Sequence, residues 1–320
     1  AARRGGGVRV MHLRVISPAE TTEQVLSYLV AEPAVANLVV HRGADVDPAG
    51  DVVIADVARE SANEVLRELK GMGLDKNGSI ALDAVGVALS SRGSEAEKAA
   101  PGAGDDAVVW EEIEQRTGEE SRLSVTFLLF LSIATVIAGI GVLLDQPILI
   151  VGAMVVGPEF GPLAALSVGV IRRRPRVIGR SLLALTVGFA VAIVVTVLST
   201  LALNAGGLVT REMLLGARPL TDFIWRPDAL SWVIAFLAGI AGILSLTTAK
   251  SGALIGVLIS VTTVPAAGNV AVAIAYGVPD EAWGSALQLG INLGAIATAG
   301  ILTLAVQRWL SRRRRPVARA

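Results

Sequence analysis

The feature that most constrains this chain is a set of long apolar stretches confined to residues 123–310. A bilayer core of about 30 Å is crossed by about 20 apolar residues of helix. Six stretches approach or exceed this length, at residues 123–144, 148–171, 177–203, 231–248, 252–276 and 285–310. The sequence therefore predicts an all-α polytopic membrane domain of six transmembrane helices, with the lipid bilayer as its partner.

Composition supports two regions of different character. Hydrophobic residues make up 53% of the 320 residues and charged residues 18%, which is too apolar for an average soluble protein. The net charge of +0 gives nucleic acid no bulk attraction, and the lack of cysteine excludes disulfides and thiolate metal sites. His12 and His41 both fall in predicted strands. We therefore expect no nucleic-acid partner, no metal centre and no cofactor.

Residues 1–90 alternate strand-like and helix-like patterns. Ser17 and Pro18 begin the first helix pattern, and Gly71 and Gly73 end the second. The strand patterns lie at residues 8–16, 34–40, 51–57 and 79–89. This βαββαβ order is the split βαβ pattern, so we predict a ferredoxin-like α+β domain. Such a fold implies no function by itself, and an assembly module and a ligand sensor that gates the membrane part both stay open.

Residues 91–122 are predicted to connect the two domains. Residues 90–106 are rich in Gly, Ser, Ala and charge, which is typical of a flexible linker. Residues 108–122 predict a polar juxtamembrane helix, whose Trp110 lies either at the headgroup level or against the soluble domain. Residues 311–320 form a basic tail.

Basic residues suggest an orientation in the membrane. They lie between spans two and three (Arg172, Arg173, Arg174 and Arg176), between spans four and five (Lys250), and after span six (Arg308 and Arg312 to Arg315). Cytoplasmic loops carry an excess of Lys and Arg, although such runs can also bind anionic lipid. The start of the chain lacks the apolar core of a signal peptide. We therefore expect a multi-pass protein of the cell membrane with both termini in the cytoplasm, and residues 204–230 lying on the outer face.

Spans two and five contain residues that interrupt helices. Span two carries Gly157-Pro158-Glu159-Phe160-Gly161-Pro162 near its centre, and span five carries Thr262, Thr263, Pro265, Gly268 and Asn269. Proline removes an amide donor and clashes with the preceding turn. These spans are the second members of two three-span groups that run in opposite senses. Interrupted segments in corresponding positions of an inverted 3+3 repeat indicate a transporter's binding site.

Glu159 is the most unusual residue of the membrane domain, because a carboxylate at this depth costs about 2.5–3.5 kcal/mol even on insertion scales. It is either a proton or cation site or a neutral cap of a helix fragment. Its candidate polar partners, which otherwise form only interhelical hydrogen bonds, are Asn269, Asn292, Gln288, Thr262 and Thr263. The candidate substrate- or ion-binding residues are Glu159, Gly157, Pro158, Gly161, Pro162, Thr262, Thr263, Pro265, Asn269 and Asn292. Two glycine pairs, Gly252 with Gly256 and Gly290 with Gly294, predict close helix contacts.

Two segments carry a family resemblance. GAMVVGPEFGPL (residues 152–163) and SGALIGVLISVTTVPAAGN (residues 251–269) resemble the signature segments of the bacterial and archaeal membrane family named domain of unknown function 389. WEEIEQRTGEES (residues 110–121) and Asn292 are similar too. The residues within the family's Gly-Pro-x-x-Gly-Pro core are usually less charged than Glu159 and Phe160. The resemblance implies an architecture and names no substrate.

These patterns favour a transporter or channel for a small solute or ion, with its site at the broken centres of spans two and five. The N-terminal domain would modulate or assemble it, and its sheet edges favour a homo-oligomer. The alternative is a membrane-anchored ligand sensor or oligomeric scaffold without transport. A lipid-directed enzyme would need a nucleophile and base or a metal cluster. The sequence offers neither, so we expect no enzyme and no catalytic residues.

Overall fold

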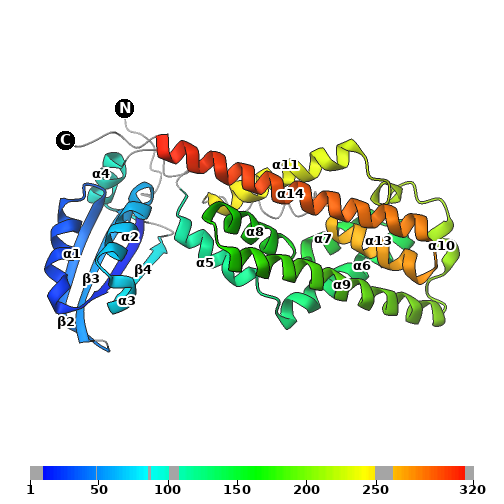
Figure 1. Cartoon of the computed structure of the whole chain (residues 1–320), viewed down its shortest axis with the longest axis horizontal. Coiled ribbons are helices and arrows are strands. Elements are labelled where there is room, and N and C mark those ends of the chain that lie inside the picture. The colour runs from blue at the N-terminus through cyan, green and yellow to red at the C-terminus, as the bar shows by residue number, and fades with distance from the viewer. Residues whose placement is uncertain (1–9, 48, 86–87, 101–107, 249–261, 314–320) are drawn as a thin grey trace. The chain divides into compact units, whose positions relative to one another are not determined.

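The computed structural model describes residues 10–47, 49–85, 88–100, 108–248 and 262–313. The chain divides into two compact units, one formed by residues 1–111 with 310–320 and the other by residues 112–309. The first unit contains a sheet with helices, and the second is helical (Figure 1). The change in composition along the sequence likewise separates an N-terminal region of ordinary charge from an apolar C-terminal region.

The first unit is built on a four-stranded antiparallel sheet with the order β2-β3-β1-β4. Its strands are β1 (Val10–Ser17), β2 (Val35–Val46), β3 (Ala49–Ala58) and β4 (Ser79–Ala84). In the centre of the sheet, Leu13 of β1 pairs with Ala55 of β3 and with Leu82 of β4. All four predicted strands are therefore present, and the last one is shorter than its predicted range of 79–89.

Two helices cover one face of this sheet. They are α1 (Ala19–Ala31) and α2 (Ala62–Gly71), with the short turns η1 (Arg59–Ser61) and α3 (Leu74–Asn77) beside α2. Leu13 on β1, Leu29 on α1 and Leu69 on α2 belong to one buried cluster. His12 and Arg14, which alternate with Leu13 along β1, are exposed. This alternation fits a sheet that buries one face and leaves the other to solvent.

Part of the predicted linker is folded. Residues Ser91–Ala99 form helix α4, whose N-cap hydroxyl on Ser90 accepts a hydrogen bond from the Gly93 amide at 3.0 Å. Gly93, Ala96 and Ala100 are buried at helical spacing, and α4 packs against β2 and β3. The expectation of a flexible linker is therefore wrong for residues 91–100, because small residues on one helical face pack well without large apolar side chains. Residues 101–107 lie outside the described part of the chain.

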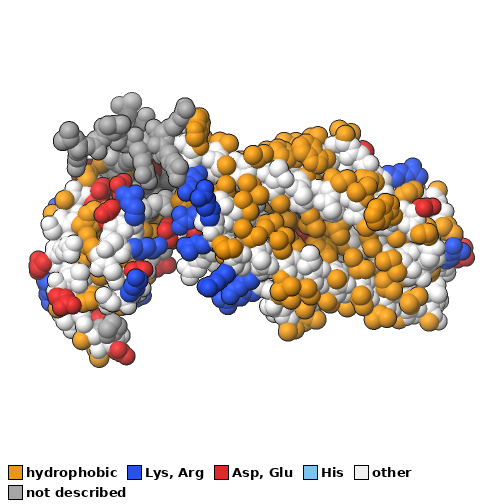
Figure 2. Space-filling view, in the orientation of Figure 1, with side chains coloured by type: hydrophobic (Ala, Val, Ile, Leu, Met, Phe, Trp, Pro, Cys, Tyr) orange, Lys and Arg blue, Asp and Glu red, His pale blue; other side chains and the backbone are white. Residues whose placement is uncertain are grey.

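The second unit contains four helices that are long and apolar enough to cross a membrane. They are α6 (Val125–Leu143), α9 (Pro175–Ala205), α11 (Ala229–Thr247) and α14 (Pro279–Arg313), and they match predicted spans one, three, four and six. The polar helix α5 (Trp110–Glu120) precedes them. Figure 2 shows hydrophobic side chains spread over the visible face of the helical unit. Such a surface suits contact with lipid.

Span two is broken, as the sequence predicts. It consists of α7 (Pro147–Val156) and α8 (Phe160–Arg172), which are bent by 50° at a break between them. The break falls at Gly157, Pro158 and Glu159. Proline removes the amide that would continue α7 and disfavours the helical conformation of the residue before it. If this bent pair is one span, the described residues contain five candidate spans.

Only the second half of span five is described. Helix α13 runs without a break from Thr263 to Ala275, so Gly268 and Asn269 lie inside it and do not interrupt it. Pro265 lies in its first turn, where a missing amide breaks no helical hydrogen bond. The first half of the span, residues 252–261, lies outside the described residues, so six spans and a second broken helix remain predictions.

Helix α6 packs against α7, α9 and α13. Its backbone meets that of α13, because a Cβ atom added to Gly268 would lie 2.8 Å from the amide nitrogen of Gly139. A Cβ added to Gly290 or Gly294 would meet nothing within 4 Å among the described residues. The close contact predicted at that pair is therefore not formed with any described residue and stays a prediction. Gly252 and Gly256 lie outside the described residues.

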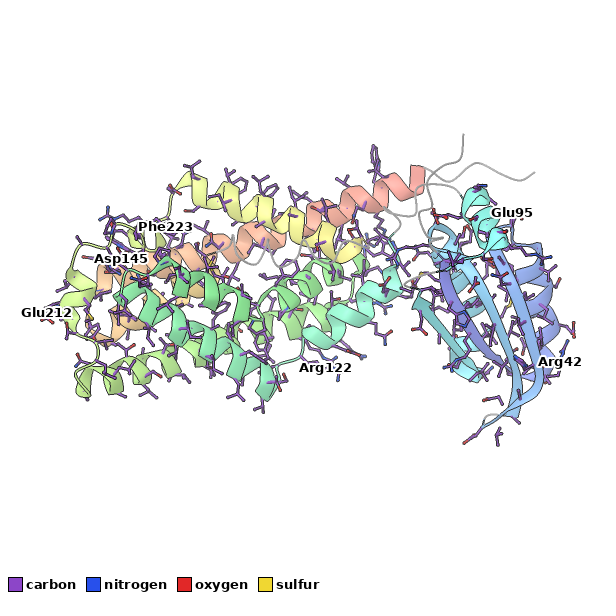
Figure 3. All side chains as sticks on the ribbon, turned by 180° about the vertical axis from the view of Figure 1, so that it is seen from behind. Arg42, Glu95, Arg122, Asp145, Glu212 and Phe223 are labelled. Atoms are coloured by element: carbon purple, nitrogen blue, oxygen red, sulfur yellow. The ribbon has the colours of Figure 1, made fainter. Side chains whose placement is uncertain are left out.

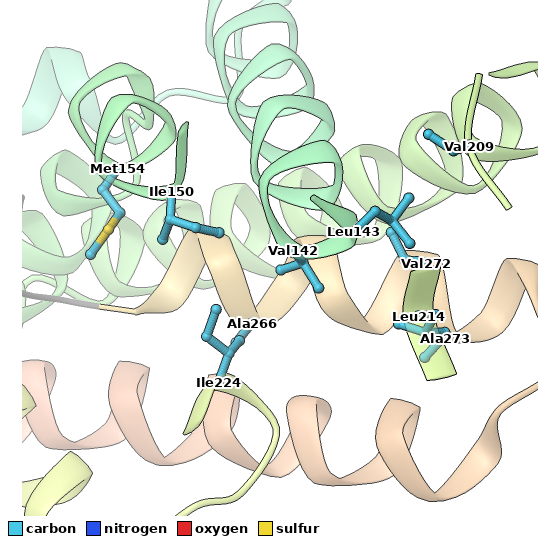
Figure 4. Close-up of a cluster of buried hydrophobic side chains, with 10 residues drawn as sticks. All are labelled: Val142, Leu143, Ile150, Met154, Val209, Leu214, Ile224, Ala266, Val272 and Ala273. Atoms are coloured by element: carbon cyan, nitrogen blue, oxygen red, sulfur yellow. The ribbon is translucent and has the colours of Figure 1, made fainter. Parts of the chain in front are cut away.

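One end of the helical unit is closed by residues 206–228, which we call the end loop. The loop contains α10 (Arg211–Leu215) and η3 (Asp222–Ile224). Leu214 and Ile224 are buried in a cluster with residues of α6, α7 and α13 (Figure 4). Apolar side chains therefore pack this segment against the bundle, while its predicted position on the outer face stays a prediction.

Hydrogen bonds also anchor the end loop. Asp145, between α6 and α7, accepts hydrogen bonds from the Leu220 amide at 3.1 Å and from the Thr221 hydroxyl at 2.9 Å. Figure 3 shows Asp145, Glu212 and Phe223 at the same end of the helical unit. Glu281 lies near the start of α14, whereas Arg308 lies near its C-terminal end. Arg308 donates a hydrogen bond of 2.6 Å to the carbonyl of Ile171, at the C-terminal end of α8. The arginines after α8 therefore lie at the end that is opposite to the end loop.

Candidate functional site

The break in span two meets the start of α13. Glu159 directly precedes α8, and the residue is only 5% exposed. Its Oε1 atom accepts a hydrogen bond of 2.7 Å from the Thr263 hydroxyl, on the first residue of α13. The structure thus brings together two candidate residues that are 104 positions apart in the sequence.

The second carboxyl oxygen of Glu159 has no partner among the described residues. Oε2 is buried and accepts no hydrogen bond. The Glu159 side chain also caps no amide of α8, so the alternative role as a cap of that helix is not what the structure shows. A buried polar atom without a partner costs about 1–3 kcal/mol, and more when it is charged. This oxygen is therefore available to a proton or to a bound cation.

Gly157 makes room for this carboxyl group. A Cβ atom at position 157 would lie 2.4 Å from Oε2 of Glu159 and 2.7 Å from a methyl carbon of Val264. Any larger residue would push the carboxyl group or α13 away. The Gly157-Pro158-Glu159 sequence therefore ends α7 and also shapes the space around the acid.

Two helix starts lie beside the carboxyl group. Helix α8 begins directly after Glu159, and α13 begins at Thr263, which donates to it. Helix N-termini carry a partial positive charge. In discontinuous membrane helices they often point at anionic groups. Here the Glu159 side chain itself supplies an acidic group at that position.

Thr262, the residue before α13, belongs to a neighbouring polar group. Its hydroxyl oxygen accepts a 2.8 Å hydrogen bond from the amide of Asn292 on α14. Gln288, four residues earlier on α14, donates to the Asn292 side chain at 3.3 Å. The Oε1 atom of Gln288 is buried without a partner among the described residues. Thr262 and Asn292, both candidate residues, therefore meet each other on a different side of the α13 start from Glu159.

Asn269 contributes to a third group, which lies away from Glu159. Its amide donates to Glu281 at 3.0 Å and to Ser285 at 2.7 Å. Arg218 of the end loop donates to Glu281 at 2.5 Å. The Arg218 and Glu281 side chains are 4% and 7% exposed. This buried ion pair joins the end loop to α13 and α14.

Sequence reasoning missed the ion pair between Arg218 and Glu281. The end loop carries both signs of charge, which is typical of a solvated segment, and Glu281 precedes the predicted start of span six. The available signal was the position of Glu281, four residues before Ser285 at the edge of a long apolar stretch. An acid at such an edge faces either solvent or a cation, and the sequence does not distinguish them.

The remaining candidates shape the helix starts. Gly161 and Pro162 lie in the first turn of α8 and are buried, as is Pro265 in the first turn of α13. Pro158 lies between α7 and α8 and is partly buried. None of these side chains brings a charge or a hydrogen-bonding atom to the site. Their role in the structure is to begin or end a helix.

A cavity of about 250 Å³ lies next to the pair formed by Thr262 and Asn292. Its other described walls come from α7, α11 and the end loop. The lining residues are Pro147, Ile150, Val151, Met154, Leu220, Thr221, Phe223, Ile224, Ser231, Ile234, Ala235, Thr262 and Asn292. Across the residues that the structure describes, no three His, Asp or Glu side chains are close enough together to hold a metal ion.

Comparison with known proteins shows that the part of the helical unit that contains Glu159, Asn269 and Asn292 is similar to a known family. The family model described as "Domain of unknown function (DUF389)" matches residues 154–298. Residues 154–298 are thus similar to this family, and we call them the DUF389-like region, or DUF389 domain for short. The resemblance of the two sequence segments is thereby confirmed. The DUF389 domain contains the break in span two, the end loop and the polar groups around Glu159, Asn269 and Asn292.

A relative is similar to part of the chain. The uncharacterised protein MJ0678 of Methanocaldococcus jannaschii is 26% identical over 207 residues, which are 63% of this chain and 62% of the relative. The match thus spans less than two thirds of the relative's length. No solved structure matches the chain. The descriptions of this family and of this relative name no activity that could be carried over to the chain.

Proposed function

We propose that this protein is a membrane transporter or channel for a small solute or ion, with its site between the α7–α8 break and the start of α13. The observation that carries the proposal is Glu159. It is buried, one of its oxygens is held by Thr263, and the other has no partner among the described residues. Ionisable groups inside membrane domains mark ion or substrate pathways by default.

The two short helices give further support to an inverted 3+3 repeat. Both α8 and α13 have 13 residues, and both carry a proline at their third position, Pro162 and Pro265. In the proposed six-span topology they are the second halves of spans two and five. Transporter sites commonly lie where such discontinuous helices of two repeats meet.

The proposed setting is the cell membrane, with both termini in the cytoplasm. The arginines that follow α8 lie at one end of the helical unit, while Asp145, Glu281 and the end loop lie at the other. This distribution supports the orientation, because cytoplasmic ends carry the excess of Arg and Lys.

We further propose that the sheet unit is ferredoxin-like and that it assembles or modulates the membrane part. The order β2-β3-β1-β4 places β3 between β1 and β2 and supports the split βαβ arrangement. Its edge strands β2 and β4 favour pairing between copies, so we expect a homo-oligomer. Native mass spectrometry in mild detergent checks this, and a monomer would contradict it.

Replacing Glu159 tests the proposed site. We expect Glu159→Gln to lower flux of protons or solute from proteoliposomes about tenfold or more, because a charge-assisted hydrogen bond contributes about 1.5–3 kcal/mol. Flux is measured with an internal pH dye and with a panel of released solutes. Glu212→Gln, at an exposed acid on α10, is the matched control and should leave flux unchanged.

The rival function predicts a different result. A ligand sensor or scaffold without transport would show no flux for any solute of the panel, while a ligand would still bind to the sheet unit of the full-length protein. Equal flux through the wild type and Glu159→Gln would leave transport possible but remove Glu159 from the pathway.

A further inference from the structure

We propose that the cavity beside Thr262 and Asn292 binds a small uncharged molecule with an apolar body and one hydrogen-bond acceptor. This inference rests on the proposed function, since it names a kind of solute that the proposed transporter takes and a second place where it binds. It concerns a different group of residues from Glu159, which does not line the cavity among the described residues.

The walls of the cavity exclude a charged solute. Its apolar lining includes Ile150 and Met154 of α7, Ile224 of the end loop, and Ile234 and Ala235 of α11. None of the described lining residues carries a charge. An ion that enters such a space loses its hydration without a compensating partner, which is far more costly than burial of a neutral polar group.

The polar end of the cavity selects an acceptor. The Thr262 hydroxyl oxygen accepts a hydrogen bond from Asn292, so its own hydrogen is left to donate. The Asn292 amide oxygen is already bonded to Gln288. Among the described residues the Thr262 hydroxyl hydrogen has no acceptor, so it can donate to the oxygen of an alcohol, a ketone or an ether. Small-molecule sites commonly combine apolar walls with a few polar groups that fix orientation.

The volume limits the size of the molecule. A dry cavity of about 150 Å³ accommodates benzene, and this cavity measures about 250 Å³. An apolar body of about six to ten non-hydrogen atoms therefore fits inside it, and the half-exposed Phe223 and Ile234 leave one side of the cavity open. An alcohol with a chain of six carbons lies in this range.

The start of α13 connects this cavity to the acid. Thr262 faces the cavity and bonds Asn292, while the next residue, Thr263, bonds Glu159. A solute that displaces Thr262 also moves Thr263 relative to the carboxyl group. Binding of the neutral solute and occupation of the Glu159 oxygen are therefore coupled through one peptide unit.

Photolabelling tests the inference without measuring transport. The full-length protein in lipid nanodiscs is irradiated with a six-carbon alcohol that carries a diazirine, and the labelled residues are mapped by mass spectrometry. We expect adducts on the cavity-lining segments of α7, α11 and the end loop. The matching six-carbon diazirine amine, which is protonated at neutral pH, should label them at least tenfold less.

Three variants test whether the label binds inside the cavity and whether it uses the Thr262 donor. Ala235→Phe fills the cavity and should reduce labelling at least tenfold, while Leu237→Phe places the same side chain at an exposed position on the same helix and should leave it unchanged. Thr262→Val removes the donor with little change in shape, and we expect labelling to fall about fivefold. This variant keeps the test valid if Ala235→Phe does not fold.

The possible outcomes distinguish the proposal of binding in the cavity from the proposal of transport. Labelling spread along the exposed side chains of α11 and unchanged in both Ala235→Phe and Thr262→Val would overturn the cavity assignment. Equal labelling by the amine would overturn the selection for uncharged molecules. Labelling of the cavity in a protein that shows no flux would support this inference and contradict transport, whereas flux without cavity labelling would do the reverse.

Discussion

Arg218→Met is expected to lower the free energy of unfolding of the helical unit by about 3–5 kcal/mol, because it leaves the buried Glu281 carboxylate without its cationic partner. The two side chains are 4% and 7% exposed, and Asn269 and Ser285 complete the group. Neither amide nor hydroxyl can neutralise the carboxylate. The measurement is unfolding of the purified protein in detergent, followed by tryptophan fluorescence.

Arg226→Met is the matched control for this prediction. Arg226 pairs with Asp222 at 3.1 Å in the same loop, but its side chain is 64% exposed. Exposed ion pairs contribute about 0–1 kcal/mol. The double variant Arg218→Met, Glu281→Leu should recover much of the loss, since an apolar pair can replace a buried ion pair. Equal losses for Arg218→Met and Arg226→Met would show that the pair does not hold the end loop.

Gly268→Val is the second change with a large expected effect. The added Cβ atom would lie 2.8 Å from the Gly139 amide nitrogen and 3.0 Å from the Thr135 carbonyl oxygen, both on α6. Backbone atoms cannot rotate away as side chains do, so α6 and α13 must separate. Overpacking typically costs about 1–3 kcal/mol and sometimes more, and here the displaced helix also carries Thr263. We expect a lower unfolding temperature and a smaller fraction of correctly folded protein, because α6 and α13 no longer pack closely.

Gly290→Val gives the comparison for this change. A Cβ atom added to Gly290 meets nothing within 4 Å among the described residues, and changes at exposed positions are usually within about 0.5 kcal/mol. Thermal unfolding followed by size-exclusion chromatography of the detergent-solubilised protein measures both variants. If both unfold at the same temperature, the close contact of α6 and α13 does not stabilise the protein.

Features with local causes could be predicted from the sequence. The α7–α8 break follows from Gly157 and Pro158, because their effects on the backbone do not depend on the rest of the fold. The four long helices follow from stretches of apolar residues. The strands of the first unit follow from short β-branched segments between turn residues. Each of these signals lies within the segment that it describes.

Features that depend on tertiary contacts could not be predicted in detail. Sequence reasoning named Thr263 and Asn292 among several possible partners of Glu159, and only the fold shows that Thr263 bonds it and that Asn292 bonds Thr262 instead. The pairing of Arg218 with Glu281 depends on a loop folding back over two helices. Helix α4 depends on small residues, whose packing a composition rich in Gly, Ser and Ala conceals.

The bond between Glu159 and Thr263 also has a consequence for biosynthesis. The acid is translated 104 residues before the threonine that binds it. At about 5–20 residues per second this interval lasts about 5–20 s. In a chain that inserts while it is being translated, the Glu159 carboxyl group has no hydrogen bond from Thr263 throughout that time. The bond that joins spans two and five therefore forms late, only after α13 has been made, and cannot guide the insertion of span two.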